Sequence, residues 1–567
     1  MKKSFTKMIR GISSMLAAVM ATTVCPIVAY ADEDQPYDFE VDGLRFNIIS
    51  EEEKTCELTF NTDTFYPGDI VVPEIANGYT VAKLGLYAFY CCYDLTSVSI
   101  PQTVTEYGEW CFVDTKLKNI DISKNVTTIY GNTFDGNKEL EAFNVENDNP
   151  NYKSVDGVLF RRDMKTLLMA PCKLSGTYYI PDTVENLANN AFAFCKLLEE
   201  VYIPESVTYM EASMFIDCTS LRKVKLPSSL TSIPPATFSN CKSLVEVVIP
   251  ERVETIGFGA FGACESLKEI TLPLNLKTMD WGVFKGCCSL EKVVFNKSLQ
   301  SIGAWSFQNC SSLKAVTLPV SLEVMEEDIF SGCSSLEEIN VEEGNNNFVS
   351  ENGILFSADM ATLIVFPVGR NLKEYIVPGS VEIIGGGAFR SSSLERITMT
   401  SVKEIQPYGF AACESLAIIS FGDLLETIGY DAFYKCPKIR TINLPATVSY
   451  IGDTAFGRCT GLESITVLNS VPPVVGEDED VFDQETLASA SLYVPESAIV
   501  DYKTADVWKN FVSILPLESG IESINPESAS HDAVWFNIYG QRVQTPVSDP
   551  GIYLIHKNGK MEKILIK

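Results

Sequence analysis

Histidine, the side chain most often used for acid–base catalysis near neutral pH, occurs only twice in the 567 residues, as His531 and His556. A histidine-based catalytic triad, a zinc-peptidase site or a Cys/His zinc cluster in the body of the chain therefore has no histidine to use. An enzyme built on this sequence would have to rely on carboxylates, lysine, tyrosine or cysteine.

The cysteines are the reactive residues with the most regular spacing. Eleven of the 17 stand three residues after a recurring phenylalanine: Cys92, Cys195, Cys218, Cys241, Cys264, Cys287, Cys310, Cys333, Cys413, Cys436 and Cys459. We interpret them as an internal ladder of buried thiols. A disulfide scaffold is the alternative in an exported protein, but stacked repeats point successive side chains in parallel, which is poor disulfide geometry. Cys91 and Cys288 are expected to lie off the ladder and to be more open to solvent.

Other chemical motifs give no site. Gly257-x-Gly259-x-x-Gly262 matches a dinucleotide fingerprint, but it lies inside a repeat without a βαβ unit, and Gly257 is expected to turn the chain. The acidic run from Glu477 to Asp483 lacks the glycine and the terminal glutamate of an EF-hand, and is interpreted as a solvated loop. The sequence therefore predicts no catalytic residue, no metal and no cofactor.

The elements that carry these residues are repeats. The segment from Ile256 to Pro273 recurs, and its phenylalanine occurs 14 times, with nine of the 13 gaps equal to 23 residues: Phe89, Phe112, Phe134, Phe192, Phe215, Phe238, Phe261, Phe284, Phe307, Phe330, Phe389, Phe410, Phe433 and Phe456. Within one unit, Leu267-x-x-Ile270-x-Leu272 alternates as a short strand that Pro273 ends. A period of 23 is typical of leucine-rich repeats. We predict an α/β-type repeat solenoid with a parallel β ladder and little helix.

The domain organisation follows from where the repeats begin and end. Lys2, Lys3, Lys7 and Arg10 precede an apolar run, which predicts a signal peptide over 1–31. We expect an N-terminal cap over 32–82, a solenoid of about 14 units over 83–470, a C-terminal cap over 471–516 and a small β module over 520–567. Two similar inserts, near 145–180 and 341–377, resemble hairpins with turns near Arg162-Asp163 and Ala358-Asp359. Each is either a brace, which its apolar composition favours, or a recognition knob.

The repeated Pro, Ile-Gly, Ala-Phe-x-x-Cys and Ser-Leu-x-x-Ile pattern resembles the BspA-type, or Treponema pallidum-type, leucine-rich repeat over roughly residues 36 to 516. That resemblance implies a secreted bacterial protein retained at the cell surface, and some members are adhesins for host matrix proteins or other cells. The C-terminal piece, with Asn537 to Arg542 and Pro550 to Tyr553, is similar to a type IX secretion sorting domain. It implies outer-membrane secretion machinery as a partner; a small β-domain without a transport role is the alternative.

Composition and strand alternation point to a binding role. A net charge of −30 disfavours nucleic acid or an anionic membrane as the main partner, and no transmembrane span is expected in the mature protein. The residue between the last two apolar strand positions is expected to face the concave side, where it would contact an extracellular protein or glycoprotein. The candidate ligand-binding residues in this column are Asp121, Asn144, Tyr202, Lys225, Thr271, Thr317, Asn340, Thr398 and Asn443.

Tyr202 is predicted to be the single aromatic residue in that column and is the first choice of contact. The sequence therefore favours a surface-exposed bacterial binding protein, an adhesin for host or neighbouring-cell proteins, that is not an enzyme. A carboxylate-based glycan-active enzyme and a passive surface-layer or spacer protein are the alternatives.

Overall fold

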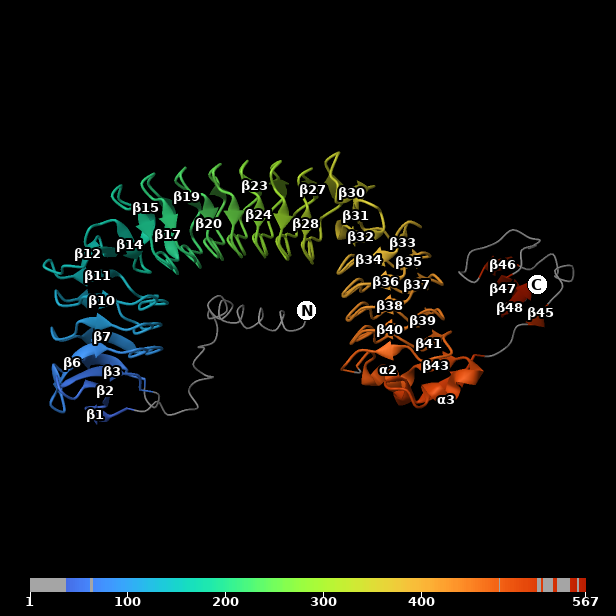
Figure 1. Cartoon of the computed structure of the whole chain (residues 1–567), viewed down its shortest axis with the longest axis horizontal. Helices are drawn as coiled ribbons and strands as arrows, with labels where there is room; N and C mark the ends of the chain where they lie inside the picture. The colour runs from blue at the N-terminus through green and yellow to red at the C-terminus, as the bar shows by residue number, and fades with distance from the viewer. Residues whose placement is uncertain are drawn as a thin grey trace. The chain divides into compact units, whose positions relative to one another are not determined.

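A computed structural model describes residues 37–61, 65–478 and 480–517, together with four strands of the C-terminal segment. The expected signal peptide over 1–31 lies outside the described residues. The chain divides into two compact units, residues 1–334 and 335–567. Each consists mainly of stacked coils, which appear in Figure 1 as successive arrows joined by turns.

Each coil contributes two strands to two parallel ladders. In the coil that carries Phe261, the short strand β22 (Thr255–Ile256) leads into the turn with Phe261, and β23 (Glu269–Thr271) follows. Thr255 pairs in parallel with Thr278 of the next coil, and Glu269 pairs with Lys292. Successive coils therefore place equal repeat positions side by side, as the parallel-ladder prediction requires. We call the ladder that contains β23 the first ladder and the one that contains β22 the second ladder.

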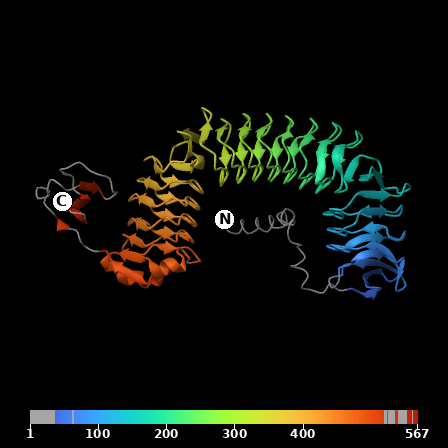
Figure 2. The same ribbon diagram turned by 180° about the vertical axis from the view of Figure 1, so that it is seen from behind.

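In residues 1–334 the first ladder position is taken by β4 (Gly68–Val71), β7 (Leu95–Ser99), β9 (Asn119–Ile122), β11 (Ala142–Val145), β15 (Ser175–Tyr179), β17 (Leu197–Tyr202), β19 (Lys223–Lys225), β21 (Glu246–Val247), β23, β25 (Lys292–Val294) and β27 (Ala315–Leu318). The second is taken by β6 (Tyr79–Leu84), β8 (Glu106–Tyr107), β10 (Thr128–Ile129), β14 (Thr166–Met169), β16 (Asn186–Leu187), β18 (Tyr209–Met210), β20 (Ser232–Ile233), β22, β24 (Thr278–Met279), β26 (Ser301–Ile302) and β28 (Val324–Met325). Figure 2 shows these strands from behind.

In residues 335–567 the first ladder position is taken by β29 (Glu338–Val341), β33 (Glu374–Ile376), β35 (Arg396–Met399), β37 (Ile418–Phe421), β39 (Thr441–Leu444), β41 (Ser464–Val467), β43 (Ser491–Val494) and β44 (Ser513–Pro516). The second is taken by β32 (Thr362–Val365), β34 (Ile383–Ile384), β36 (Glu404–Ile405), β38 (Thr427–Ile428), β40 (Tyr450–Ile451) and β42 (Val474–Val475).

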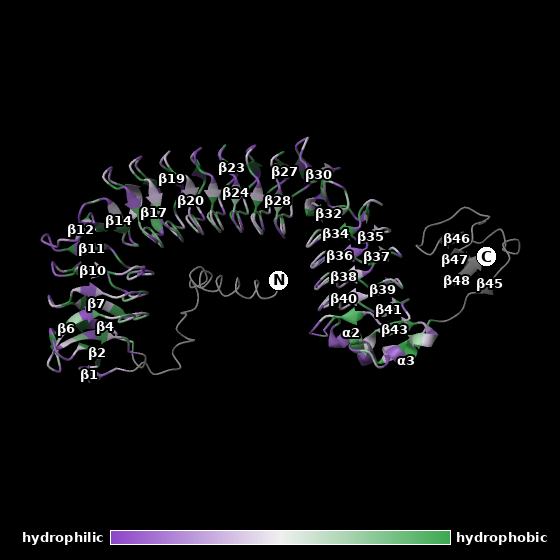
Figure 3. Ribbon diagram, viewed as in Figure 1, coloured by the Kyte–Doolittle hydropathy of each residue, from purple (hydrophilic) through white to green (hydrophobic). Residues whose placement is uncertain are grey.

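Columns of stacked phenylalanine rings run through the core of each unit. The Phe238 and Phe261 centroids are 5.2 Å apart with planes inclined by 21°, and Phe410 and Phe433 are 5.1 Å apart with planes inclined by 1°. All of these rings are fully buried. Hydrophobic and hydrophilic residues alternate along the coils in Figure 3. Because a ring stacks on the coils before and after it, each coil completes the core of its neighbours.

The turn around each anchor phenylalanine carries two left-handed residues, two positions before and two after the ring. In the Phe261 coil they are Gly259, with φ +57°, and Ala263, with φ +55°. Gly257 lies between β22 and this turn, and its φ is outside the left-handed region. A Cβ at Gly257 would lie 2.7 Å from the nitrogen of Pro235, so glycine is required there for close packing on the preceding coil.

Both inserts contain the predicted hairpin and one further strand. In the first, β12 (Tyr152–Val155), β13 (Val158–Arg161) and β14 form an antiparallel meander with an exposed turn at Arg162 and Asp163. The second repeats it with β30 (Phe348–Glu351), β31 (Ile354–Ser357) and β32. β14 then joins the second ladder in parallel with β16. Leu159, Phe160 and Leu167 are buried, so the insert strands extend the core.

The ends of the coil array have their own elements. At the N-terminal end, β1 (Phe39–Val41), β2 (Leu44–Ser50), β3 (Thr55–Thr59) and β5 (Ile75–Ala76) join the sheet of β6. The other end carries short helices: α2 (Gln484–Ser489), the 3-10 helix η3 (Glu496–Ala498), α3 (Ile499–Tyr502) and the 3-10 helix η4 (Trp508–Asn510). A further 3-10 helix, η2 (Val368–Arg370), lies in the second insert. The indole Nε1–H of the buried Trp508 donates to the carbonyl oxygen of Pro473 at 3.0 Å.

The C-terminal segment forms a separate four-stranded sheet in the order β45 (Glu522–Ser523), β48 (Lys560–Ile566), β47 (Gly551–Lys557) and β46 (Val534–Asn537). This sheet lies within residues 520–567, where the sequence predicts a small β module.

Candidate binding surface

Strand alternation in the first ladder divides each strand into core residues and solvent residues. In β23, Ile270 is buried while Glu269 and Thr271 are exposed. The ladder register holds equal positions opposite each other, with Glu200 against Lys223 and Tyr202 against Lys225. The outward side chains therefore form columns across successive strands. We call the column that contains Tyr202 the Tyr202 column.

All nine candidate residues lie on strands of the first ladder, and none is buried. In residues 1–334 these are Asp121, Asn144, Tyr202, Lys225, Thr271 and Thr317; in residues 335–567 they are Asn340, Thr398 and Asn443. Tyr202, Asn340 and Thr398 are half-buried, and the other six are exposed. The structure thus places six candidates on one unit and three on the other, and whether any of them contacts a ligand stays a prediction.

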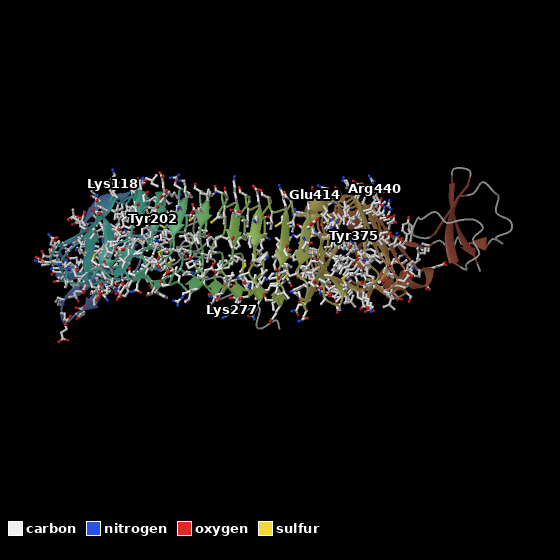
Figure 4. All side chains as sticks on the ribbon, turned by 90° about the horizontal axis from the view of Figure 1, so that it is seen from above. Lys118, Tyr202, Lys277, Tyr375, Glu414 and Arg440 are labelled. Carbon is white, nitrogen blue, oxygen red and sulfur yellow. The ribbon has the colours of Figure 1, made fainter. Side chains whose placement is uncertain are left out.

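Tyr202 has an aromatic partner that sequence reasoning missed. The rings of Tyr202 and Tyr179 are stacked with centroids 4.7 Å apart and planes inclined by 12°. Tyr179 stands opposite Tyr202 in the register and is 67% exposed. The prediction of a single aromatic residue in this column is therefore wrong. Figure 4 labels Tyr202 between Lys118 and Lys277, which lie at opposite edges of the same unit.

The spacing of Tyr179 could have revealed it. Tyr179-Ile180-Pro181 precedes Tyr202-Ile203-Pro204 by 23 residues, but its coil has Ala170 in place of the anchor phenylalanine. The Ala170 N–H donates to the carbonyl oxygen of Ala191, the residue before the next anchor, at 2.7 Å. The anchor phenylalanines of neighbouring coils make the equivalent hydrogen bond to the coil that follows them. A search that follows the proline rather than the phenylalanine finds this coil.

Polar contacts order the surface around the tyrosine pair. The Tyr202 hydroxyl donates to Glu200 at 3.1 Å, and this hydrogen bond to the carboxylate raises the pKa of Tyr202. Lys223 Nζ lies 3.3 Å from Glu246 Oε2. In an earlier coil, Asn144 Nδ2 donates to Asp121 Oδ1 at 2.8 Å. Exposed pairs of this kind add little stability, but they link neighbouring side chains along the strands of the first ladder.

The cysteine ladder is structural. The Cys264 thiol donates to the carbonyl of Phe238 in the preceding coil at 3.2 Å, and the same bond recurs at Cys218, Cys241, Cys287, Cys310, Cys333, Cys436 and Cys459. Burial raises the pKa of the Cys333 and Cys459 thiols to about 12, so they are not thiolates near neutral pH. The described cysteines are free thiols, which confirms the ladder and not the disulfide scaffold.

The two cysteines placed off the ladder differ from each other. Cys288 is exposed, as expected, whereas Cys91 is buried, so that expectation is wrong for Cys91. Cys91 packs with Phe60, Tyr90 and Val113 in a cluster that Tyr87 and Trp110 border. Phe60 comes from the segment before the regular repeats, and its contribution was not visible in the repeat pattern.

The acidic loop forms hydrogen bonds with the preceding coil. Asp453 Oδ1 accepts a hydrogen bond from the Asp478 N–H at 3.0 Å, and Asp480 and Asp483 accept from the backbone of Thr454 and Arg458. Glu479 lies outside the described residues. Across the described ranges, no group of three His, Cys, Asp or Glu residues is placed to hold a metal ion.

The two ladders, the stacked rings and the repeated turns define a leucine-rich-repeat solenoid. The family model described as the "BspA type Leucine rich repeat region (6 copies)" matches residues 59–162, 163–245, 231–353 and 365–487. These ranges make up well over half of the sequence. The chain belongs to the BspA-type leucine-rich-repeat family.

Several solved structures are similar. A leucine rich cell surface protein from Faecalibacterium prausnitzii A2-165 is 22% identical, with 86% of this chain and 96% of that chain covered and a TM-score of 0.33. A leucine-rich repeat protein from Bacteroides ovatus ATCC 8483 is 22% identical, with 85% and 100% covered and a TM-score of 0.33. The pneumococcal vaccine antigen PcpA is 17% identical, with 85% and 98% covered and a TM-score of 0.32.

No curated protein sequence matches the chain. Within the part of the chain that the structure describes, no helix has the length and apolar character needed to cross a membrane.

Proposed function

We propose that this protein is secreted, retained at the bacterial surface and used as an adhesin that recognises a host or neighbouring-cell protein. The observation that carries the proposal is the Tyr202 column of residues 1–334, where exposed polar and aromatic side chains stand in register on stacked strands. Repeat solenoids use extended surfaces of this kind for protein ligands. Membership of the BspA-type family supports the same role.

The binding site is centred on Tyr179, Tyr202 and Lys225. The stacked tyrosines offer a rigid apolar surface with two hydroxyl groups, and Lys225 adds a positive charge beside them in the register. Tyrosine is enriched among the residues that dominate protein interfaces because it buries a large area at low entropy cost.

The test is a binding assay of the full chain against immobilised matrix proteins, mucins and a glycan array. An acidic protein of equal size and different fold controls for charge. We expect saturable binding to a protein or glycoprotein that Tyr202→Ala and Lys225→Glu each weaken about tenfold, the size of a typical hot-spot loss. Tyr450→Ala, at an exposed tyrosine on β40 of the second ladder and outside the candidate column, is the matched control.

Three results would contradict the proposal. Binding that survives both substitutions would show that this face is the wrong one. No binding above the acidic control would favour a passive surface-layer or spacer protein, and turnover of a glycan or peptide by the purified chain would favour an enzyme.

We further propose that the C-terminal sheet of β45 to β48 is a sorting module for outer-membrane secretion machinery. Its support is the sequence similarity of residues 520–567 and the separate sheet that these strands form. Removing residues 520–567 should leave the protein inside the outer membrane, as measured by protease accessibility on intact cells. Unchanged surface exposure would refute this role.

A further inference from the structure

A groove lies on residues 1–334 where the second ladder is interrupted. Its volume is about 540 Å³, which is in the range of small-ligand sites, roughly 300–1,000 Å³. The residues that line it come from the four successive coils that carry β16, β18, β20 and β22. Between β14 and β28, all of which the structure describes, β18 and β20 are the one pair of successive second-ladder strands that no backbone hydrogen bonds join. The groove therefore coincides with a break in the ladder.

Pro234 accounts for the break. In the following coil, the Gly257 N–H donates to the carbonyl oxygen of Ile233 at 2.9 Å. The equivalent donor to the Met210 carbonyl oxygen would be residue 234, which is a proline and has no N–H. Met210 and Pro234 both line the groove. The groove therefore contains a carbonyl oxygen that has lost its ladder donor and can accept a hydrogen bond from a ligand.

An aromatic ring and hydroxyl groups stand beside the break. Tyr209 begins β18 and is 57% exposed, and its position is taken by Ser232 in β20 and by Thr255 in β22. All three residues line the groove, and their hydroxyl groups have no hydrogen-bond partner among the described residues. The groove thus offers a largely exposed ring together with three hydroxyl groups that can donate to a ligand or accept from it.

Glu211 is the one charged residue in the lining of the groove. Its Oε2 accepts a hydrogen bond from the Asn189 N–H at 3.0 Å, which holds the carboxylate in place, while Oε1 has no partner in the part of the chain that the structure describes. A carboxylate accepts strong hydrogen bonds from hydroxyl groups. It also repels anions, as does the net charge of −30. The ligand is therefore expected to be a hydrogen-bond donor without negative charge.

We propose that this groove binds a neutral pyranose unit of a glycan. A pyranose has a face of C–H groups with partial positive charge, which stacks favourably on the negative face of an aromatic ring such as that of Tyr209. Its hydroxyl groups donate to the Met210 carbonyl oxygen and to the Glu211 carboxylate. The site lies on the second ladder and the Tyr202 column on the first, so the inference goes beyond the proposed function and does not rest on it.

The probes are four small sugars that form two matched pairs. Methyl glucoside and methyl galactoside are neutral, whereas glucuronic acid and galacturonic acid carry a carboxylate on the corresponding rings. Titration of each into the full chain, followed by saturation-transfer difference NMR, measures the affinity and identifies the sugar protons that contact the protein. We expect saturable binding of at least one neutral glycoside, with its acid bound at least about tenfold more weakly because of Glu211.

Substitutions at Tyr209 locate the site. Tyr209→Ala should weaken the neutral glycoside about tenfold, whereas Tyr209→Phe keeps the ring and should stay within about threefold of the natural protein. Tyr450→Ala is the matched control, since Tyr450 begins β40 as Tyr209 begins β18 and is 39% exposed. Thermal melting of all three variants should be unchanged, because both side chains are exposed.

Three results would overturn the saccharide site. They are no saturable binding of either neutral glycoside up to about 10 mM, equal weakening by Tyr209→Ala and Tyr450→Ala, and equal affinity for a glycoside and its acid. Binding of a proline-rich peptide in place of any sugar, lost in Tyr209→Ala, would also overturn it and make the groove a peptide site. Tyr202→Ala should leave sugar binding unchanged, so failure of the adhesin proposal in the matrix-protein assay is measured separately.

Discussion

Thiol chemistry separates Cys288 from the other described cysteines. Cys264 and its equivalents are fully buried and donate to backbone carbonyls, whereas Cys288 is exposed. Buried thiols with raised pKa values react slowly, because the thiolate is the nucleophile.

We therefore expect iodoacetamide to modify Cys288 first in the native protein, and to reach the ladder cysteines only on unfolding. Peptide mass spectrometry after a short pulse measures this, and Cys288→Ser should remove the early product. Early modification of Cys264 or Cys436 would show that the ladder opens in the native state.

A buried carboxylate gives residues 1–334 a pH dependence. Asp135 Oδ2 accepts a hydrogen bond from Asn190 Nδ2 at 2.8 Å, while its Oδ1 is buried without a hydrogen-bond partner among the described residues. Burial raises the pKa of Asp135 to about 6, with a smaller contribution from the charge of Asp114. The folded state therefore binds this proton more tightly than the unfolded chain, so the free energy of unfolding falls as pH rises through about 6.

Asp135→Asn removes this titration while an amide oxygen can still accept from Asn190. We expect the variant to be more stable than the natural protein at pH 7.5 by about 1–2 kcal/mol, with the gain vanishing near pH 4. Urea unfolding at the two pH values measures the difference, and Asp148→Asn, at an exposed aspartate, is the control. A gain of equal size at both pH values would contradict the assignment.

The inserts contribute to the core through buried strands. Phe160 on β13 is fully buried, whereas Arg162 is exposed in the turn that follows. If the insert is a brace, Phe160→Ala should lower the free energy of unfolding by about 3–5 kcal/mol.

Arg162→Ala should change neither stability nor ligand binding by a measurable amount. Thermal melting and the matrix-protein assay together decide between the two roles. Loss of binding in Arg162→Ala, with unchanged melting, would instead identify the turn as a recognition knob.

The repeating elements were predictable because their physics is local and periodic. Apolar alternation around Ile270, the proline that ends the strand and the spacing of the phenylalanines each report a contact that recurs in every coil. What escaped prediction lies where the pattern changes: Tyr179 belongs to a coil with Ala170 at the anchor position, and Cys91 is covered by Phe60 from outside the repeats. The sequence placed Gly257 correctly in the coil. Whether a glycine is needed for a positive φ or for close backbone packing depends on the neighbouring coil, which the sequence does not show.

The candidate site was predictable only as a set of outward positions. Alternation along a strand determines which side chains face solvent, and it located all nine residues of the column on strands. It carries no information about which of them binds, because affinity depends on packing between columns. The stacking of Tyr179 on Tyr202 is a relation between coils, and it emerges only when the coils are placed side by side.

Stability across the solenoid is expected to be local. Phe433 stacks on Phe410 at 5.1 Å and on Phe456 at 5.3 Å, so its loss removes contacts from three adjacent coils. Phe433→Ala should cost about 3–5 kcal/mol and accelerate amide hydrogen exchange across residues 404–475, while residues 240–290 keep their protection. Tyr450→Ala, at an exposed side chain of the same unit, is the control. Uniform acceleration over both ranges would refute nearest-neighbour stability.

Because each anchor ring presents equivalent faces to the coil before and the coil after it, a whole coil can be gained or lost without changing the environment of those that remain. The thiol hydrogen bonds show that the stacking tolerates coils of different length. The Cys436 thiol donates to the carbonyl of Phe410, 26 residues earlier, whereas the Cys413 thiol donates to the carbonyl of Phe389, 24 residues earlier. In-frame duplication of one unit would thus lengthen the array by about 4.8 Å per event. The length of the solenoid and the number of positions available for recognition can therefore evolve through changes in the number of repeats alone.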